Sequence, residues 1–182
     1  MRGYARNSLP LALGWFFVFA TLLFGQGMGI AFGAVEDDIK AGLSARGEAV
    51  LSEVYQGDRG ALEAVSKKAW SYYKRAHLHA GGMGTTAAVL LGLLGLLVGQ
   101  DRLRGAVALA LGAGAFGYSF FWYLAGRAAP ALGSTGAAKE AYANLARMSS
   151  GFYVAATVWV AVILGLTLWR AWREGQAAAP KG

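Results

Sequence analysis

The sequence contains no cysteine, two histidines, three prolines and few charged residues. The absence of cysteine excludes disulfide frameworks, thiol nucleophiles, cysteine-ligated zinc, iron–sulfur clusters and covalently attached c-type haem. Charged residues make up 15% of the 182 residues, well below the roughly 25% of a soluble globular domain. Hydrophobic residues make up 56%, and the mean hydropathy is +0.41. These values argue against a soluble domain.

The apolar residues are concentrated in four runs, at 9–35, 81–99, 105–126 and 151–169. A helix needs about 20 residues to cross the roughly 30 Å of hydrocarbon in a bilayer. The pattern therefore predicts an all-α, polytopic integral membrane protein whose four transmembrane helices form a bundle in contact with the lipid bilayer. The whole chain, 1–182, is then a single membrane domain, with a flexible tail at 175–182.

The first apolar run also has features of a secretory signal peptide. Arg2 and Arg6 precede it, and Ala31-Phe32-Gly33 offers small residues at a cleavage position. The apolar core of a signal peptide is typically about 7–15 residues long, whereas this run is longer. The length favours an uncleaved helix; a cleaved signal would leave three spans.

The segment 36–80 has a different composition from the four runs. Apolar residues recur at helical spacing on both sides of a turn at 56–60, and polar residues fill the opposite faces. The residues 35–80 carry seven acidic and seven basic side chains. We therefore expect an antiparallel helical hairpin outside the membrane, between the first and second spans.

The basic residues predict the orientation. Seven of the 17 Lys and Arg residues lie in three short segments, at 1–8, 100–104 and 170–182. Because Lys and Arg concentrate on the cytoplasmic side of a membrane, both termini should be cytoplasmic and the hairpin should lie on the outer side, with a bacterial inner membrane as the expected location. The basic residues form neither a stripe nor an RNA-binding motif, which argues against nucleic-acid binding.

Both histidines, His77 and His79, lie where the second span begins. Ionisable groups at membrane depth are candidate functional residues. Residues two apart point about 200° apart on a helix, so these two cannot bind one ion together unless the helix breaks at Gly81-Gly82. On an intact helix, one would face the other spans and the second would face lipid headgroups, water or a partner. Met83 shares a face with His79.

The predicted topology brings further polar groups and methionines to the same end of the spans as the histidines. Such a set can hold haem b or a Cu, Zn or Fe ion. The alternative is that these groups form hydrogen bonds and ion pairs with each other or with the backbone. Because both histidines are on one helix, a bis-histidine haem within one subunit is disfavoured. The candidate cofactor-binding residues are His77, His79, Met83 and Met148; the candidate metal ligands are His77, His79, Glu36, Asp37 and Glu140.

Glycines at four-residue spacing predict close helix packing. Gly25, Gly29 and Gly33 occur in the first span, and Gly95 and Gly99 occur in the second. Such spacing lets the backbones of two membrane helices approach each other. The partner helix can belong to the same chain or to an oligomer, and the same surface can instead accept a lipid or quinone tail.

No serine-hydrolase elbow, P-loop, zinc-protease helix or EF-hand loop occurs in the sequence, so catalysis is not favoured. The first functional hypothesis is a membrane subunit or assembly component that binds protein partners, either other membrane subunits or a second copy, through its hairpin and glycine-rich faces. The alternative is a haem- or metal-binding, or quinone-interacting, electron-transfer protein centred on His77 and His79. A third hypothesis is a membrane sensor.

Overall fold

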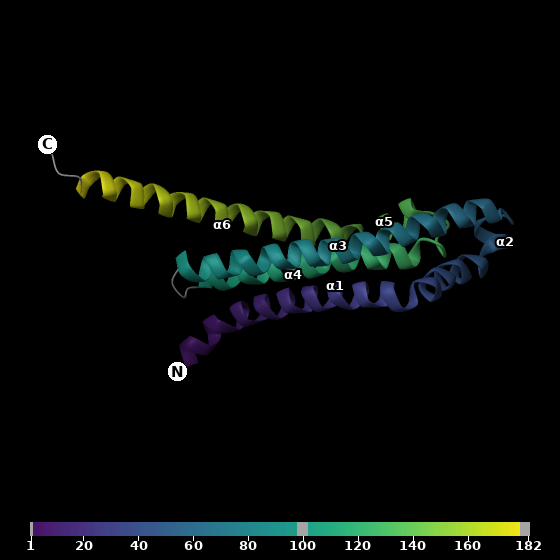
Figure 1. Cartoon of the computed structure of the whole chain (residues 1–182), viewed down its shortest axis with the longest axis horizontal. Coiled ribbons are helices and arrows are strands. Elements are labelled where there is room, and N and C mark those ends of the chain that lie inside the picture. Colours follow the sequence, from purple (N-terminus) through teal and green to yellow (C-terminus); the bar gives the residue numbers. More distant parts are fainter. Residues whose placement is uncertain (1, 98–101, 179–182) are drawn as a thin grey trace.

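The computed structural model describes residues 2–97 and 102–178, with side chains for 9–97 and 102–176. The described residues form helices and no strands, so the all-helical prediction is confirmed. Four of the helices are long and apolar enough to cross a membrane, as the four apolar runs indicate. The helices, shown in Figure 1, are α1 (Arg2–Glu48), α2 (Leu51–Val54), α3 (Arg59–Leu97), α4 (Arg102–Ala128), α5 (Thr135–Ala141) and α6 (Ala143–Ala178).

The four predicted spans belong to helices that are longer than the apolar runs. The helix of the first run, α1, continues to Glu48, and α3 begins at Arg59, about six turns before the second run. Residues 98 and 99 of the second run lie outside the described residues. At the C-terminus, α6 continues to Ala178, past the predicted start of the tail at Gly175, because alanines favour the helix. Residues 179–182 of that tail also lie outside the described residues.

The first long helix bends at Val35, which has the non-helical angles φ −142° and ψ 34°. Beyond this kink, α1 runs on beside the first half of α3 and is joined to it by residues 49–58, which include α2. The connection turns sharply at Gln56 and Gly57, which have φ values of 54° and 83°. The side chain of Asp58 then caps α3 by accepting a hydrogen bond of 2.9 Å from the backbone N–H of Ala61.

The connection between α1 and α3 is hydrogen-bonded to the connection between α4 and α5. The hydroxyl of Tyr55 donates a hydrogen bond of 2.7 Å to the carbonyl oxygen of Pro130, which follows α4. Tyr55 is buried in this contact. The end of the α1–α3 hairpin is therefore fixed against the loop between α4 and α5.

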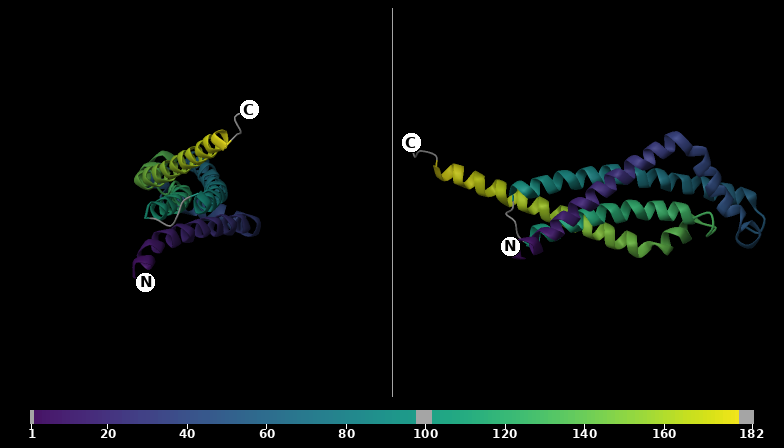
Figure 2. Two further views of the ribbon diagram at one scale, coloured as in Figure 1. Left: turned by 90° about the vertical axis from the view of Figure 1, so that its left-hand side faces the viewer. Right: turned by 90° about the horizontal axis from the view of Figure 1, so that it is seen from below.

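The fourth helix is at the centre of the packing. It contacts α1, α3 and α6, whereas α6 packs mainly on α4 (Figure 2). Glycines make these close approaches possible. A Cβ atom on Gly112 would collide with the carbonyl oxygen of Gly14 in α1, and one on Gly114 would lie 2.8 Å from the carbonyl oxygen of Ser149 in α6.

The outer faces of the two peripheral spans are apolar. About 22% of the most apolar window of α1 and 11% of that of α6 is buried inside the protein, against 50% for α4. This distribution is compatible with contact between α1, α6 and the lipid bilayer. The large exposed apolar residues of these two spans include Leu9, Phe16, Phe19, Leu23, Ile30, Phe152, Val158, Val162, Leu166 and Trp169.

Candidate functional site

The segment with both histidines belongs to an unbroken helix, since α3 is continuous through Gly81 and Gly82. His77 points toward α1, where its Nδ1 lies 2.8 Å from the carbonyl oxygen of Gly25. A carbonyl only accepts hydrogen bonds, so Nδ1 must carry the proton and donate. The ring also packs edge-on against Phe32, with 5.6 Å between the ring centroids.

The second histidine points toward α4. The ring of His79 lies 5.1 Å from the ring of Tyr118 and stacks at 6.1 Å on that of Trp122. The guanidinium of Arg75 lies over the ring of Trp122, 4.9 Å from its centroid. Burial, followed by the charge of Arg75, lowers the pKa of His79 below its usual value. Its neutral form is therefore favoured.

The prediction that one histidine of an intact helix faces outward differs from the structure. The two rings do point in different directions, as a spacing of two residues requires. However, α3 packs against both α1 and α4, so both directions lead to another helix. Leu78, between the two histidines, is the exposed residue instead.

The glycines predicted to pack differ from one another in their surroundings. A Cβ on Gly25 would lie 3.0 Å from the Cβ of Ala80, and one on Gly29 would lie 3.0 Å from the His77 ring, so these two glycines let α3 approach α1. Gly33 has nothing within 4 Å of such a Cβ, and Gly95 has only the guanidinium of Arg104. Gly99 lies outside the described residues.

The structure does not bring the candidate metal ligands together. The carboxylate of Glu36 lies 2.5 Å from the amine of Lys40, and that of Asp37 lies 4.0 Å from the same amine. Glu140 pairs instead with Arg147, at 3.7 Å. Among the described residues, no group of three or more His, Asp or Glu side chains is placed to hold a metal ion.

The methionines give the haem hypothesis no geometric support either. Met148 is 60% exposed, while Met83 packs against the apolar core formed by all four long helices. The carbonyl of Met83 accepts a hydrogen bond of 3.2 Å from the hydroxyl of Tyr153 in α6. A haem or metal at the histidines stays a prediction; the hydrogen bond of His77 Nδ1 leaves only Nε2 of this ring as a possible ligand atom.

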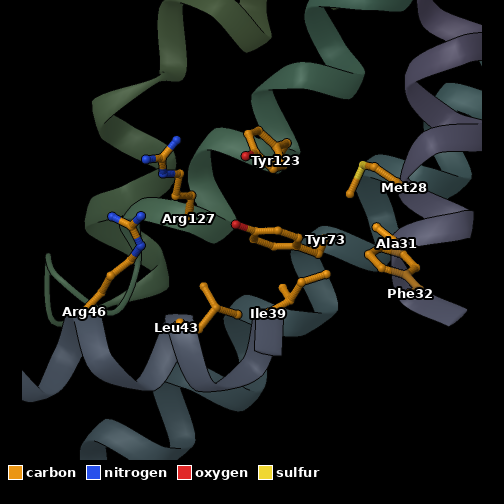
Figure 3. Close-up of a pocket in the computed structure, with 10 residues that line it drawn as sticks. Met28, Ala31, Phe32, Ile39, Leu43, Arg46, Tyr73, Tyr123 and Arg127 are labelled. Carbon is orange, nitrogen blue, oxygen red and sulfur yellow. The ribbon is translucent and has the colours of Figure 1, made fainter. Parts of the chain in front are cut away.

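A cavity of about 460 Å³ lies beside the kink in α1, and Phe32, which packs against His77, is one of its lining residues. Figure 3 shows that its lining changes in character from one end to the other. Met28, Ala31 and Phe32 lie at one end, while the guanidinium groups of Arg46 and Arg127 lie at the other, near the hydroxyl of Tyr73. The full lining is Met28, Ala31, Phe32, Ile39, Gly42, Leu43, Arg46, Tyr73, Tyr123 and Arg127.

The polar end of this cavity contains a protonated phenol. Burial raises the pKa of Tyr73 to about 12, and the neighbouring Tyr123 adds to the shift, while Arg127 and Arg46 act in the opposite direction. The Tyr73 hydroxyl is therefore available as a hydrogen-bond donor at neutral pH. The cavity was not predicted from the sequence, because it depends on the kink at Val35. No proline or other helix-breaking pattern at that position indicates a kink.

A second hollow, of about 420 Å³, lies between α1 and α3 in the hairpin. We call it the hairpin groove; it is lined by Lys40, Ser44, Glu63, Ser66, Lys67 and Trp70. The amine of Lys40 lies over the ring of Trp70, 5.5 Å from its centroid. The hydroxyl oxygen of Ser66 is buried and has no hydrogen-bond partner within the described chain.

Neither a protein-family model, nor a curated protein, nor a solved structure matches the chain. Function must therefore be argued from the chemistry of the cavity, the groove and the two histidines.

Proposed function

We propose that this chain is a non-catalytic integral membrane subunit, or an assembly component, that binds a segment of another membrane subunit in its hairpin groove. In this proposal the four long apolar helices cross the membrane as a bundle, and the hairpin 36–80 projects from it. The proposed location is a bacterial inner membrane, and the distribution of Lys and Arg supports an orientation with both termini in the cytoplasm and the hairpin on the outer side.

The observation that carries the proposal is the buried hydroxyl of Ser66. Buried polar atoms in proteins are nearly always hydrogen-bonded, and an unmade bond costs about 1–3 kcal/mol. Because this oxygen is buried, a docked chain supplies the missing partner only by displacing the side chains that cover it. Ser66 lines a groove of about 420 Å³, which is large enough for a few side chains. The unsatisfied hydroxyl therefore belongs to a residue beside space that a partner can occupy.

The charges of the hairpin groove fit a polypeptide segment. Lys40 and Lys67 lie at the same groove as Glu63, so acidic and basic side chains of a partner both find a counterpart. Trp70 supplies an aromatic surface, a residue type that is enriched where proteins bind each other. The segment 35–80 as a whole has seven acidic and seven basic residues, and this balance favours a specific partner over general attraction to anionic surfaces.

Site-specific photo-crosslinking in membranes of the source organism tests this proposal. The photoreactive residue p-benzoylphenylalanine is placed at Lys67, which lines the groove, and at the exposed neighbour Lys68, which does not. We expect a crosslinked product of one defined mass from position 67 and not from position 68. Mass spectrometry of the product should identify a membrane protein, or a second copy of this chain if the product has twice the chain's mass.

A substitution inside the groove makes the crosslink specific to this surface. Ser66→Leu removes the unpartnered hydroxyl and places a larger side chain at the groove, so it should abolish the product formed from position 67. The matched control is Ser71→Leu, since the Ser71 hydroxyl bonds only to the carbonyl of Lys68 on the same helix. Equal products from positions 67 and 68, or a product that survives Ser66→Leu, would overturn the proposal.

A further inference from the structure

The cavity lies beside the kink in α1, where the first span ends and the hairpin begins. Because Val35 leaves the helical conformation, the axis of α1 changes direction there, and the wall formed by α3 and α4 is left partly uncovered. The resulting volume of about 460 Å³ is within the range of ligand pockets, roughly 300–1,000 Å³.

The polar end of the cavity carries two positive charges from distant parts of the sequence. Arg46 comes from the hairpin part of α1, and Arg127 from the end of α4. Both arginines are exposed at the cavity, and in the described parts of the chain no carboxylate lies within 4 Å of either guanidinium. The hydroxyl of Tyr73 is directed toward them (Figure 3). Guanidinium groups recognise phosphate and carboxylate oxygens with pairs of hydrogen bonds.

The other end of the cavity is apolar and belongs to the first membrane span. Met28, Ala31 and Phe32 line it and lie on the membrane side of the kink. An occupant must therefore have a negative headgroup and an apolar chain, in that order along the direction from the hairpin to the span. A water-soluble anion would leave the apolar end unused, and a neutral hydrocarbon would leave the arginines unused.

We propose that this cavity binds an anionic membrane lipid, with a headgroup oxyanion between Arg46 and Arg127 and one acyl chain along Met28, Ala31 and Phe32. This proposal does not depend on a protein partner in the hairpin groove, which shares no lining residue with the cavity. The headgroup oxyanion can be the phosphate of a phospholipid or the carboxylate of a fatty acid.

The first test measures lipid retention by native mass spectrometry of the full chain in detergent, with added palmitoyl-oleoyl-phosphatidylglycerol. The variant Arg46→Gln/Arg127→Gln should lower the affinity for this lipid by roughly tenfold or more, since each cation near a lipid headgroup strengthens binding severalfold. The matched control is Arg59→Gln/Arg147→Gln. It removes the same charge from residues outside the cavity and should leave the affinity within about twofold.

Two other probes identify the source of the oxyanion. Oleate that competes with phosphatidylglycerol in the wild type, but not in the cavity variant, would extend the proposal to fatty acids. Inorganic phosphate should not displace the lipid at equal concentration, because it has no chain for the apolar end. Equal retention of phosphatidylglycerol and phosphatidylcholine by the wild type, equal loss in both double variants, or displacement by inorganic phosphate would overturn the proposal.

The second test fills the cavity without changing its charge. Gly42 lines the cavity, and a Cβ atom there would have nothing within 4 Å, so Gly42→Leu adds a side chain without a clash. Gly82→Leu in α3 is the matched control: its Cβ position is also open, and it lies outside the cavity. We expect Gly42→Leu to lower lipid affinity at least tenfold and Gly82→Leu to leave it unchanged. The same affinity in both variants would contradict the proposed site.

Discussion

The two helices α4 and α6 have similar lengths of apolar sequence but different surroundings. The most apolar window of α4 has a mean hydropathy of 1.4 and is 50% buried, whereas that of α6 has a mean hydropathy of 2.0 and is 11% buried. The helix with the lower hydropathy is thus the central one. In a membrane, lipid tails are as apolar as neighbouring helices, so moving an apolar side chain from lipid to a helix contact changes its free energy little. The helix in the interior is therefore recognised by its small residues and not by large apolar ones.

The glycines of α4 account for this difference. Gly112 lies against α1, Gly114 and Gly117 lie against α6, and Gly126 lies against α3. Gly151, Gly165 and Gly175 of α6 have nothing within 4 Å of a Cβ position. Glycine therefore permits close packing in α4 but not in α6. Substituting glycines in each helix and comparing the loss of stability tests this difference.

The largest effect is expected at the crossing of α4 and α1. Gly112→Leu would force a side chain into the backbone of Gly14, and overpacking of this kind costs about 3 kcal/mol or more. The midpoint of thermal unfolding in detergent, followed by circular dichroism, should fall by roughly 6–12 °C. Gly165→Leu in α6 is the control and should change it by about 2 °C or less. Similar values for the two variants would show that α4 is not the centre of the packing.

A smaller effect is expected at the contact between α4 and α6. A Cβ on Gly114 would lie 2.8 Å from the carbonyl oxygen of Ser149 and 2.9 Å from the nitrogen of Tyr153, so Gly114→Leu should separate the two helices at a cost of about 2 kcal/mol. The chain has no cysteine, so Ala156→Cys, at a buried position of α6, provides a unique thiol. It should react faster with a fluorescent maleimide in the Gly114→Leu background.

The control for this measurement is Gly151→Leu, because the Cβ position of Gly151 in α6 is open. Its maleimide reaction rate should equal that of Ala156→Cys alone. If Gly114→Leu also leaves the rate unchanged, α6 is held to the other helices by contacts elsewhere than at this glycine.

Much of this arrangement follows from the sequence, for identifiable reasons. The four long apolar helices correspond to uninterrupted apolar runs, and a run of about 20 such residues has few alternatives to a membrane helix. The opposite directions of His77 and His79 follow from helix geometry alone. That both are covered by neighbouring helices does not follow from the sequence, since it depends on the packing of α3 against both α1 and α4.

The cavity and the hairpin groove could not be predicted, because both depend on tertiary geometry. Val35 bends α1 within the sequence Gly33-Ala34-Val35-Glu36, which contains no proline. The bend also explains why Gly33 lies in open space although its spacing matches that of Gly25 and Gly29. Arg46 and Arg127 meet at the cavity only because α1 continues past the kink toward the end of α4.

A moderate effect is expected where the end of α4 is tied to the hairpin. Tyr55→Phe removes the hydrogen bond to the carbonyl of Pro130 and should lower the free energy of unfolding by about 1–2 kcal/mol. Tyr142→Phe is the control, because the Tyr142 hydroxyl has no hydrogen bond within the described chain. It should have an effect below about 0.5 kcal/mol. Equal effects would show that the hydrogen bond from Tyr55 to Pro130 is not important for stability.

The hydrogen bond from Tyr55 to Pro130 also predicts that the stability of the protein depends on pH. Burial raises the pKa of Tyr55 above its usual value of 10.0, so the folded state favours the protonated phenol, which is the form that donates to Pro130. The stabilisation is complete below the unfolded pKa of about 10 and is lost as the pH rises through the folded pKa. The stability difference between wild type and Tyr55→Phe should therefore shrink above pH 10, and a constant difference from pH 8 to 11.5 would contradict this assignment.

The smallest effect is expected at the polar contact of α6. The Tyr153 hydroxyl donates to the Met83 carbonyl at 3.2 Å, but that carbonyl belongs to the interior of α3 and keeps its helical hydrogen bond when the phenol is removed. Hydrogen bonds between membrane helices contribute about 0.6 kcal/mol on average, so Tyr153→Phe should cost about that amount in a denaturant titration. A loss larger than that of Gly114→Leu would reverse the comparison, because α6 would then depend on a polar bond more than on the small residues of α4.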